Sequence, residues 1–269
     1  MVSTIAAPAG ELYHRQMLDM LQVVWGEGFL SPGGPDEVAR LIGTADLRDR
    51  AVLDIGCGAG GIDIALVRNH GAGFVTAIDI EDTVLNCARA LIAHAGLGAR
   101  IGVVKVAPGP LPFPPGSFDL VFSKDSIVHI PDKHALMAEV FRVLRPGGWF
   151  IASDWLIGHD HAPSAQMAAY IAAEGLEFDM ASTERYRDAM RSAGFIDVST
   201  TSRNGWYREA ARQELERLRG PLGAAAARIV GQEFVDQNIL VWSRMVPVLE
   251  SGEHCPTHLR ARKPPASPP

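Results

Sequence analysis

The chain has 269 residues, and 47% of them are hydrophobic, which is enough apolar material for one generous α/β domain or two small ones. Its formal net charge of −6 argues against a protein that binds the phosphate backbone of nucleic acid, because such binding requires clustered Lys and Arg. We therefore expect a folded protein whose partner is a small molecule.

A helix is predicted near the start of the chain. Apolar side chains recur at helical spacing over residues 13–25, and two glycine-rich turns interrupt the pattern over residues 26–35. This segment precedes the expected sheet and can fold across the ends of its strands. Residues 1–45 are therefore predicted to form a helical lid, with residues 26–34 as its hinge.

The middle of the chain alternates between strands and helices. A strand over residues 51–55 ends in a glycine cluster, a helix is predicted at 62–69, and a second strand at 74–79. Such a β-loop-α-β unit implies parallel strands joined by a right-handed crossover. The alternation continues with strands at 101–106, 120–123 and 149–154, and with helices at 83–95 and 133–144.

Beyond residue 154 the alternation gives way to successive helices. Helices are predicted at 162–174, 183–193, 206–219, 224–232 and 239–249, and strands at 196–201 and 257–262. We expect the helices of residues 155–195 and 205–250 to cap a substrate site, as a helical insertion that starts after the fifth strand. Residues 1–263 then form one domain, followed by a Pro-rich flexible tail at 264–269.

The glycine loop after the first predicted strand is a candidate nucleoside-binding site. Gly56, Gly58 and Gly61 satisfy the GxGxxG template of dinucleotide-binding proteins, in which glycines let a helix N-terminus approach a pyrophosphate. Asp54 precedes these glycines, and a carboxylate there suits the ammonium and sulfonium of S-adenosylmethionine better than a pyrophosphate anion. Asp79, which ends the second strand, can accept both hydrogen bonds from a ribose diol.

Two other interpretations of this loop remain open. The glycines can serve only a tight turn between strand and helix, with Asp54 as a buried, hydrogen-bonded carboxylate. A ribose contact through Asp79 is common to NAD and S-adenosylmethionine sites, so an NAD oxidoreductase or a non-catalytic nucleoside-binding protein fits the same residues.

Four segments together resemble the motifs of class I S-adenosylmethionine-dependent methyltransferases: residues 52–58 (VLDIGCG), 77–80 (AIDI), 117–123 (SFDLVFS) and 144–148 (LRPGG). The resemblance implies a Rossmann-like α/β fold, with a mostly parallel seven-stranded sheet and helices on both faces. It also implies S-adenosylmethionine as the cofactor and S-adenosylhomocysteine as the product. It says little about the methyl acceptor.

A narrower resemblance, to the phosphoethanolamine (phosphobase) N-methyltransferases, lies outside those motifs. It is carried by residues 25–34 (WGEGFLSPGG), 123–130 (SKDSIVHI) and 170–176. In that family a Tyr of the N-terminal helix and a His after the fourth strand form a catalytic latch. Tyr13 and His129 match these two positions and are the expected catalytic residues.

The two resemblances together imply which residues hold the cofactor. They are Leu30, Ser31, Asp54, Gly56, Cys57, Gly58, Gly60, Asp79, Ile80 and Lys124. The family's Asp before the fourth strand is replaced by residues 107–110 (APGP), so the adenine amino group needs another acceptor, such as a backbone carbonyl. Asp125 matches a position that faces the substrate amine.

The positions that bind the substrate phosphate in that family differ here. Only Tyr170 is retained, and the other corresponding positions hold Trp155, Glu174, Leu176 and Met245 in place of the family's Tyr, Arg and Lys. Because Glu174 would repel a phosphate in a desolvated pocket, we expect a cationic or amine-bearing substrate rather than a phosphobase. The residues expected to form its aromatic and acidic pocket are Trp155, Tyr170, Glu174 and Trp206.

Methyl transfer from a sulfonium is a direct displacement, to which a protein contributes alignment of the nucleophile and exclusion of water. An amine reaches the site protonated, and a histidine such as His129 is a suitable proton acceptor. Tyr13 would orient or share the proton, and Asp125 would hold the cationic amine. O-, S- and C-methylation stay open, as does a purely structural role for Tyr13 and His129 as core and capping residues.

The histidines of residues 159–161 (HDH) and 254–258 (HCPTH) are a second possible site. Their spacing matches no four-ligand zinc pattern, and the three cysteines are scattered without CxxC spacing, so we expect neither a metal nor a disulfide. The sequence contains neither a signal-peptide pattern nor an apolar run of membrane-spanning length. We therefore expect a cytoplasmic protein. It does not indicate an oligomeric state.

Overall fold

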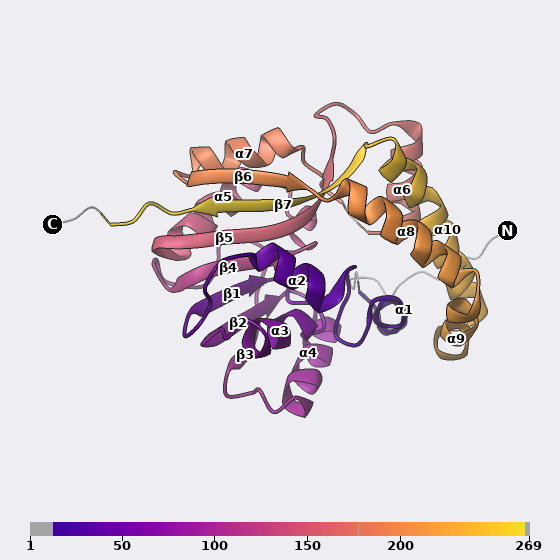
Figure 1. Cartoon of the computed structure of the whole chain (residues 1–269), viewed down its shortest axis with the longest axis horizontal. Helices are drawn as coiled ribbons and strands as arrows, with labels where there is room; N and C mark the ends of the chain where they lie inside the picture. The colour runs from indigo at the N-terminus through magenta and orange to yellow at the C-terminus, as the bar shows by residue number, and fades with distance from the viewer. Residues whose placement is uncertain (1–12, 177, 267–269) are drawn as a thin grey trace.

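The computed structural model describes residues 13–176 and 178–266. Its central element is a seven-stranded sheet of order β3-β2-β1-β4-β5-β7-β6 (Figure 1). The strands are β1 (Ala51–Ile55), β2 (Phe74–Asp79), β3 (Ile101–Lys105), β4 (Phe118–Lys124), β5 (Leu144–Ile157), β6 (Ile196–Ser202) and β7 (His254–Arg262). The first five strands are parallel, and β7 is antiparallel to both of its neighbours. The predicted Rossmann-like sheet is therefore confirmed.

The direction of winding reverses at β1. From this strand the chain adds β2 and β3 on one side and β4 and β5 on the other. The loops that leave the carboxyl ends of β1 and β4 consequently diverge and open a crevice between them. In open α/β sheets this is where ligands bind.

Helices cover both faces of the sheet (Figure 1). They are α1 (Arg15–Trp25), α2 (Gly34–Ile42), α3 (Gly61–Arg68), α4 (Asp82–His94), the 3₁₀ helix η1 (Ile127–His129), α5 (Lys133–Val143), α6 (Ala165–Glu174), α7 (Thr183–Ser192), α8 (Asn204–Leu218), α9 (Pro221–Val230) and α10 (Gln232–Glu250). Buried side chains of α2, α3 and α4 share a core with one face of the sheet, and those of α5 and α7 share a core with the other.

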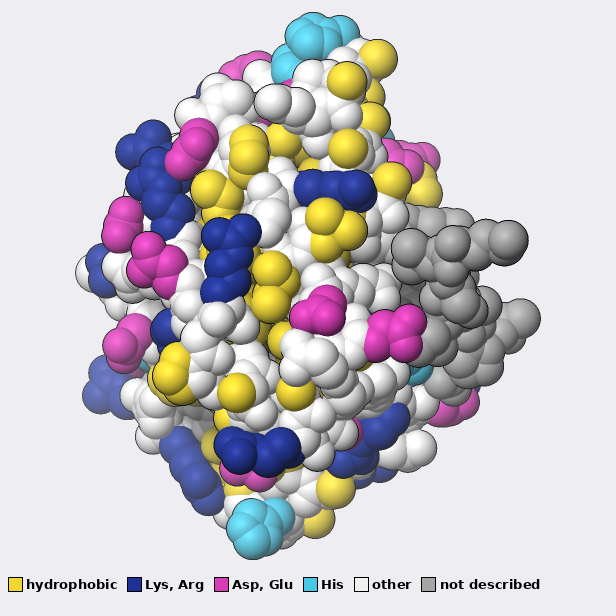
Figure 2. Space-filling model, turned by 90° about the vertical axis from the view of Figure 1, so that its right-hand side faces the viewer, with side chains coloured by type: hydrophobic (Ala, Val, Ile, Leu, Met, Phe, Trp, Pro, Cys, Tyr) yellow, Lys and Arg dark blue, Asp and Glu magenta, His cyan; other side chains and the backbone are white. Residues whose placement is uncertain are grey.

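A third core joins α1 to the late helices α6, α8, α9 and α10, and we call these five helices the cap. They lie together beyond one end of the sheet in Figure 1, and α1 contacts α9 within this group. Figure 2 views this end of the molecule and shows apolar side chains interspersed with basic and acidic ones. Most of the buried apolar contacts of α1 are therefore with the other helices of the cap.

Local sequence explains where several helices begin. Asp132, Ser164 and Ser182 cap α5, α6 and α7, because the side chain of each accepts a hydrogen bond from a backbone N–H of the first turn. α2 and α9 have Pro in the first turn, where the missing N–H has no intrahelical partner to lose.

The structure corrects the predictions in four places. α2 begins within the glycine-rich stretch at 26–35 and continues to Ile42, where no helix was predicted. α1 begins at Arg15 with His14 as its N-cap, so Tyr13 precedes the helix that was predicted to start there. β5 begins at Leu144, five residues before the strand predicted at 149–154, so it includes the LRPGG segment, and its register against β4 is irregular at this point. α7 packs beside α5 over the sheet, so it is not part of the cap predicted for residues 155–195.

None of the helices in the described part of the chain is long and apolar enough to cross a membrane. The predicted lid includes residues 1–12 and the predicted tail includes residues 267–269, and both stretches lie outside the described residues.

Candidate active site

Two adjoining cavities lie at the carboxyl ends of the parallel strands. The larger, with a volume of about 750 Å³, is bordered by the loop after β1, the end of β2 and the segments that follow β3 and β4. The smaller, of about 250 Å³, lies between the ends of β4 and β5 and the cap helices. Tyr13, Leu30, Asp125 and His129 line both cavities. Groups bound in the two cavities would therefore meet at these four side chains.

The loop after β1 lines the larger cavity through Gly56, Cys57 and Gly58. The φ angles of Gly56 and Gly58 are 76° and 56°, and the N–H groups of Gly56 and Cys57 donate to the carbonyl of Ile78 at 2.9 and 3.0 Å. A side chain at Gly56 would overlap the side chain of Ser126. Glycine is therefore required here for the left-handed backbone and for the close approach of two loops.

Asp79 places a carboxylate at the end of β2. Its Oδ1 accepts hydrogen bonds from the N–H groups of Ile80 at 2.8 Å and Glu81 at 3.1 Å, and its Oδ2 accepts from Gly58 at 3.4 Å. Burial raises the pKa of Asp79 above its ordinary value, and these backbone hydrogen bonds offset only part of the rise. Asp79 and Ile80 both line the larger cavity, where a carboxylate can accept hydrogen bonds from ribose hydroxyls.

Lys124 and Asp125 form a buried ion pair where β4 ends. Lys124 Nζ donates to Asp125 Oδ2 at 2.6 Å and to the Ser31 hydroxyl at 2.7 Å, and Ser153 of β5 donates to Asp125 Oδ1 at 2.8 Å. Asp125 has a φ of 56°, in the left-handed region that non-glycine residues seldom occupy. This network fixes the Asp125 carboxylate at the junction of the two cavities.

Tyr13 and His129, the expected catalytic residues, lie together at the same junction. The Tyr13 hydroxyl is 3.4 Å from His129 Nε2, and the two rings meet edge to face with centroids 6.2 Å apart. Burial, reinforced by the charge of Glu174, raises the pKa of Tyr13. The phenol therefore keeps its proton at neutral pH.

The smaller cavity has aromatic walls and an acidic side chain. Trp155 at the end of β5 packs against Tyr207 and His254, with ring centroids 5.0 and 5.1 Å away. Tyr170 and Glu174 reach this cavity from α6, where burial raises the pKa of Glu174 to about 7 and a hydrogen bond from Tyr170 partly offsets that rise. Among the described residues that line the cavity there is no Lys or Arg.

Three predicted site residues do not line either cavity. Gly60 forms the N-cap of α3, where a side chain would crowd Ala88 of α4. Trp206 packs against the Arg203 guanidinium, which lies 4.8 Å from the centre of its ring. Asp54 is fully buried. Side chains alternate along a strand, so Asp54 points to the same face of the sheet as Val52, which α3 covers. The predicted direct contact between Asp54 and a bound cation is therefore wrong.

Sequence reasoning missed the pair that shapes the loop after β3. Glu139 of α5 lines the larger cavity and accepts the N–H of Leu111 at 2.8 Å, while Arg142 donates to the carbonyls of Leu111 at 2.9 Å and Phe113 at 2.6 Å. Arg142 also bonds to Glu139. In sequence the two are an ordinary i,i+3 pair on a helix, so nothing indicates that they hold a loop.

A buried carboxylate that links the cap helices was also not predicted from the sequence. Glu214 of α8 is buried and accepts the indole N–H groups of Trp25 at 2.8 Å and Trp242 at 2.9 Å. Both indoles line the smaller cavity. α1 is therefore attached to α10 through α8 at the wall of the candidate substrate site.

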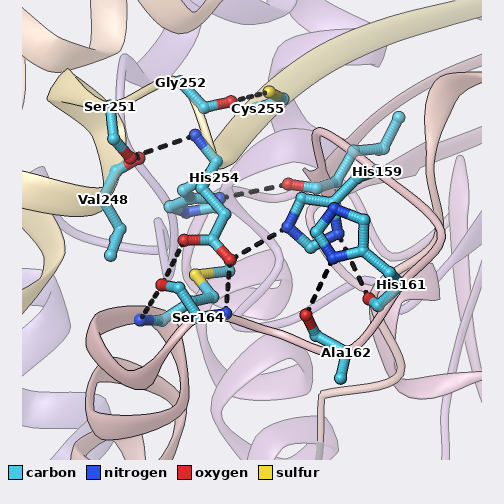
Figure 3. Close-up of polar contacts among 12 residues, drawn as sticks. His159, His161, Ala162, Ser164, Val248, Ser251, Gly252, His254 and Cys255 are labelled. Carbon is cyan, nitrogen blue, oxygen red and sulfur yellow. Dashed lines mark hydrogen bonds and ion pairs between the residues drawn. The ribbon is translucent and has the colours of Figure 1, made fainter.

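The histidines considered as a metal site make contacts with protein groups (Figure 3). His159 and His161 stack with centroids 3.5 Å apart, and His159 Nε2 contacts Glu253 at 3.0 Å. His254 Nδ1 contacts the carbonyl of Leu156 at 3.3 Å. Within the described residues, no group of three or more His, Cys, Asp or Glu could hold a metal ion.

The larger cavity suits S-adenosylmethionine. Gly56 and Gly58 of the loop after β1 line it without side chains. The Asp79 carboxylate borders it, and the carboxyl groups of Asp54 and Asp63 are buried next to Ile55 and Ile62 of its lining. Negative charge around a nucleoside-sized cavity fits a ligand that carries positive charge.

Comparison with known proteins supports this assignment. Residues 53–152 match the model of a methyltransferase domain family. The chain is 32% identical over 233 residues to a phosphoethanolamine N-methyltransferase of Triticum aestivum, an alignment that covers 86% of this chain and 44% of that protein. It is also 32% identical over 177 residues to a sarcosine/dimethylglycine N-methyltransferase of Halorhodospira halochloris, covering 65% and 62% of the two. The chain thus spans about half the length of the first of these relatives.

Among solved structures, the fold matches that of Haemonchus contortus phosphoethanolamine N-methyltransferase 2 in complex with phosphomonomethylethanolamine and S-adenosylhomocysteine. The TM-score is 0.83 at 24% identity, covering 92% of this chain and 57% of that one. At this level of identity the likeness concerns the fold. The domain match, the 32% identity to the wheat relative, the strand order and the glycine loop together identify the chain as a member of the class I S-adenosylmethionine-dependent methyltransferases.

Proposed function

We propose that this chain transfers a methyl group from S-adenosylmethionine to the nitrogen of a small amine that carries no phosphate. The observation that carries the proposal is the contact between Tyr13 and His129, at the point where the cofactor and substrate cavities join. The two relatives named as N-methyltransferases support nitrogen as the methylated atom.

The larger cavity would hold the cofactor. Asp79 would accept the ribose hydroxyls, the backbone at Gly56 and Gly58 would admit the nucleoside, and Ser31 and Lys124 would border the methionine part. The cofactor, when bound, supplies a methyl group on a positively charged sulfur, which a nucleophile can attack directly. The contribution of the chain is to align the acceptor and to exclude water.

His129 would accept the proton that an amine must lose before it can act as a nucleophile. Tyr13 cannot take this role, because burial raises its pKa and keeps the phenol protonated. At 3.4 Å its hydroxyl makes a long contact with Nε2, which an arriving amine can replace or tighten. Tyr13 would therefore orient the imidazole and close the junction, while the Asp125 carboxylate holds the cationic form of the amine.

The smaller cavity favours a substrate with positive charge. Glu174 and Asp125 supply negative charge, and the rings of Trp155 and Tyr170 can stack against a cation. A phosphate would enter a wall that offers it no Lys or Arg among the described lining residues. We therefore propose an acceptor that differs from the phosphoethanolamine named for the wheat relative.

Two measurements test the proposal. Titration calorimetry with S-adenosylmethionine, S-adenosylhomocysteine and NAD should give binding of the first two, and binding of NAD alone would contradict the proposed cofactor. Methyl-labelled S-adenosylmethionine is then incubated with a panel of amines, alcohols and thiols, and mass spectrometry locates the methyl group. Transfer to nitrogen is expected, and transfer only to oxygen, sulfur or carbon would overturn the proposed acceptor atom.

A further inference from the structure

Asp54 and Asp63 form a buried pair of carboxyl groups behind the cofactor cavity. Asp54 is the next-to-last residue of β1, before the glycine loop, and Asp63 lies in the first turn of α3, after that loop. Both side chains have 0% exposure to solvent. None of their four carboxyl oxygens has a hydrogen-bond donor from another residue of the described chain. The two carboxyl groups can therefore form a hydrogen bond only with each other, through a shared proton.

The protonation of the pair follows from its burial. Two adjacent carboxylates cannot both ionise in a dry environment, so one group keeps a proton and donates it to the other. Burial, followed by the charge of Asp54, raises the pKa of Asp63 well above its usual range. Burial likewise raises the pKa of Asp54 to about 7, against the hydrogen bond from Asp63 that lowers it. Above this pH the pair has one negative charge, and below it the pair becomes neutral.

The pair acts electrostatically on the wall of the cofactor cavity. After burial, the charges of Asp63, Asp79 and Asp54 raise the pKa of Cys57, which lines that cavity. Asp79, at the end of β2, raises the pKa values of Asp54 and Asp63 in turn. The titratable groups that face the pair are thus Cys57 from the loop and Asp79 from the neighbouring strand. A positive charge bound in the cavity would stabilise the ionised form of the pair.

We propose that Asp54 and Asp63 together make the cofactor cavity selective for a nucleoside with a positive charge, and that they release a proton when such a nucleoside binds. This inference rests on the proposed function, since it takes S-adenosylmethionine as the ligand. The sulfonium and the amino group are two possible sources of the positive charge. S-Adenosylhomocysteine has only the second of these, and adenosine has neither.

The test is titration calorimetry in two buffers with different ionisation enthalpies, which counts the protons exchanged on binding. At about pH 6.5 wild type should release a fraction of a proton with S-adenosylmethionine and none with adenosine. At about pH 8.5 the release should vanish, because Asp54 is already ionised. Affinity for S-adenosylmethionine should fall below about pH 7, by at most about tenfold for each pH unit. Release with S-adenosylhomocysteine as well would assign the effect to the amino group.

The diagnostic variant is Asp63→Asn. Its amide can donate to an ionised Asp54, so the proton release and the loss of affinity at low pH should both disappear. Asp36→Asn is the matched control, since Asp36 is an exposed residue in the first turn of α2. The ligand's own amine also titrates, so the quantity compared is the difference in proton count between wild type and each variant.

The outcomes separate this inference from the proposed function. The inference is overturned if S-adenosylmethionine binds wild type without proton release, or if Asp63→Asn releases as many protons as wild type. Either result leaves the proposed function in place. Failure of S-adenosylmethionine to bind overturns both. If Asp63→Asn does not fold, S-adenosylmethionine is compared with adenosine on wild type at about pH 6.5, where the ligand's amine is already largely protonated. Equal proton counts for the two ligands there would contradict the inference.

Discussion

The hydroxyl of Tyr13 lies 3.4 Å from Nε2 of His129, although 116 positions separate the two residues in the sequence. The contact joins the segment before α1 to the 3₁₀ helix after β4, so it closes the junction between the two cavities. If His129 accepts the proton of the substrate amine, His129→Ala should lower kcat by about 100-fold or more. Affinity for S-adenosylmethionine, measured by calorimetry, should stay almost unchanged.

Two companion variants make this result interpretable. Tyr13→Phe keeps the ring but loses the hydroxyl, so its turnover should fall less than that of His129→Ala. His134→Ala removes an exposed histidine of α5 that lines neither cavity, and its turnover should equal that of wild type. Turnover at the wild-type rate in His129→Ala would remove His129 from the mechanism.

Glu174 should make the binding of a cationic acceptor depend on pH. Burial raises its pKa to about 7, so its negative charge appears as the pH rises through 7. For an amine that stays protonated, KM should decrease from about pH 6 to about pH 8 in wild type. In Glu174→Gln the KM should be higher at pH 8 and independent of pH over this range. An equal pH dependence in both proteins would show that Glu174 does not face the acceptor.

Arg142 should support cofactor binding without touching the cofactor, because it holds two carbonyls of the loop after β3. Arg142→Gln loses charge-assisted hydrogen bonds to Leu111, Phe113 and Glu139, and its affinity for S-adenosylmethionine and adenosine should fall by about tenfold. Arg145→Gln, which loses a surface ion pair with Asp119, is the control in the same calorimetric titration. Equal affinities in the two variants would contradict this role.

Glu37 of α2 should stabilise the fold at neutral pH. Burial raises its pKa, but hydrogen bonds from His258 and Arg203 outweigh this and lower the pKa to about 2. A carboxylate with a lowered folded-state pKa stabilises the protein above its unfolded pKa, and the stabilisation is lost as pH falls toward the folded value. Glu37→Gln should therefore lower the free energy of unfolding by about 3 kcal/mol at pH 7, measured by denaturant titration. The difference from wild type should shrink between about pH 4 and pH 2. A difference that does not vary with pH would contradict the ionic origin of the effect.

The parallel half of the sheet could be predicted because interior strands such as β1 and β4 are short apolar runs that end in glycine or polar residues. α2 was missed because its Gly-Pro start is typical of a turn, although Val38, Leu41 and Ile42 form a buried helical stripe. The helix now called α7 was predicted, but its amphipathic pattern could not specify whether it would pack on the sheet or in the cap.

The candidate site was predicted less completely than the fold. Tyr13 and His129 were found through the family resemblance, because no spacing rule links a residue before α1 with one after β4. Asp54 was expected in the cofactor cavity, but its alternation with Leu53 and Ile55 directs it toward α3. Glu214 could not be identified, since its role depends on two indoles that only the packing of the cap brings together.

The central claim is tested most directly by the rates of methyl transfer to ethanolamine and phosphoethanolamine, which share one nucleophile and differ in the phosphate. Initial rates with methyl-labelled S-adenosylmethionine give kcat/KM for each acceptor. The negative charge of Glu174 and Asp125 predicts a kcat/KM for ethanolamine at least about tenfold above that for phosphoethanolamine. A higher kcat/KM for phosphoethanolamine would contradict the account of the substrate cavity.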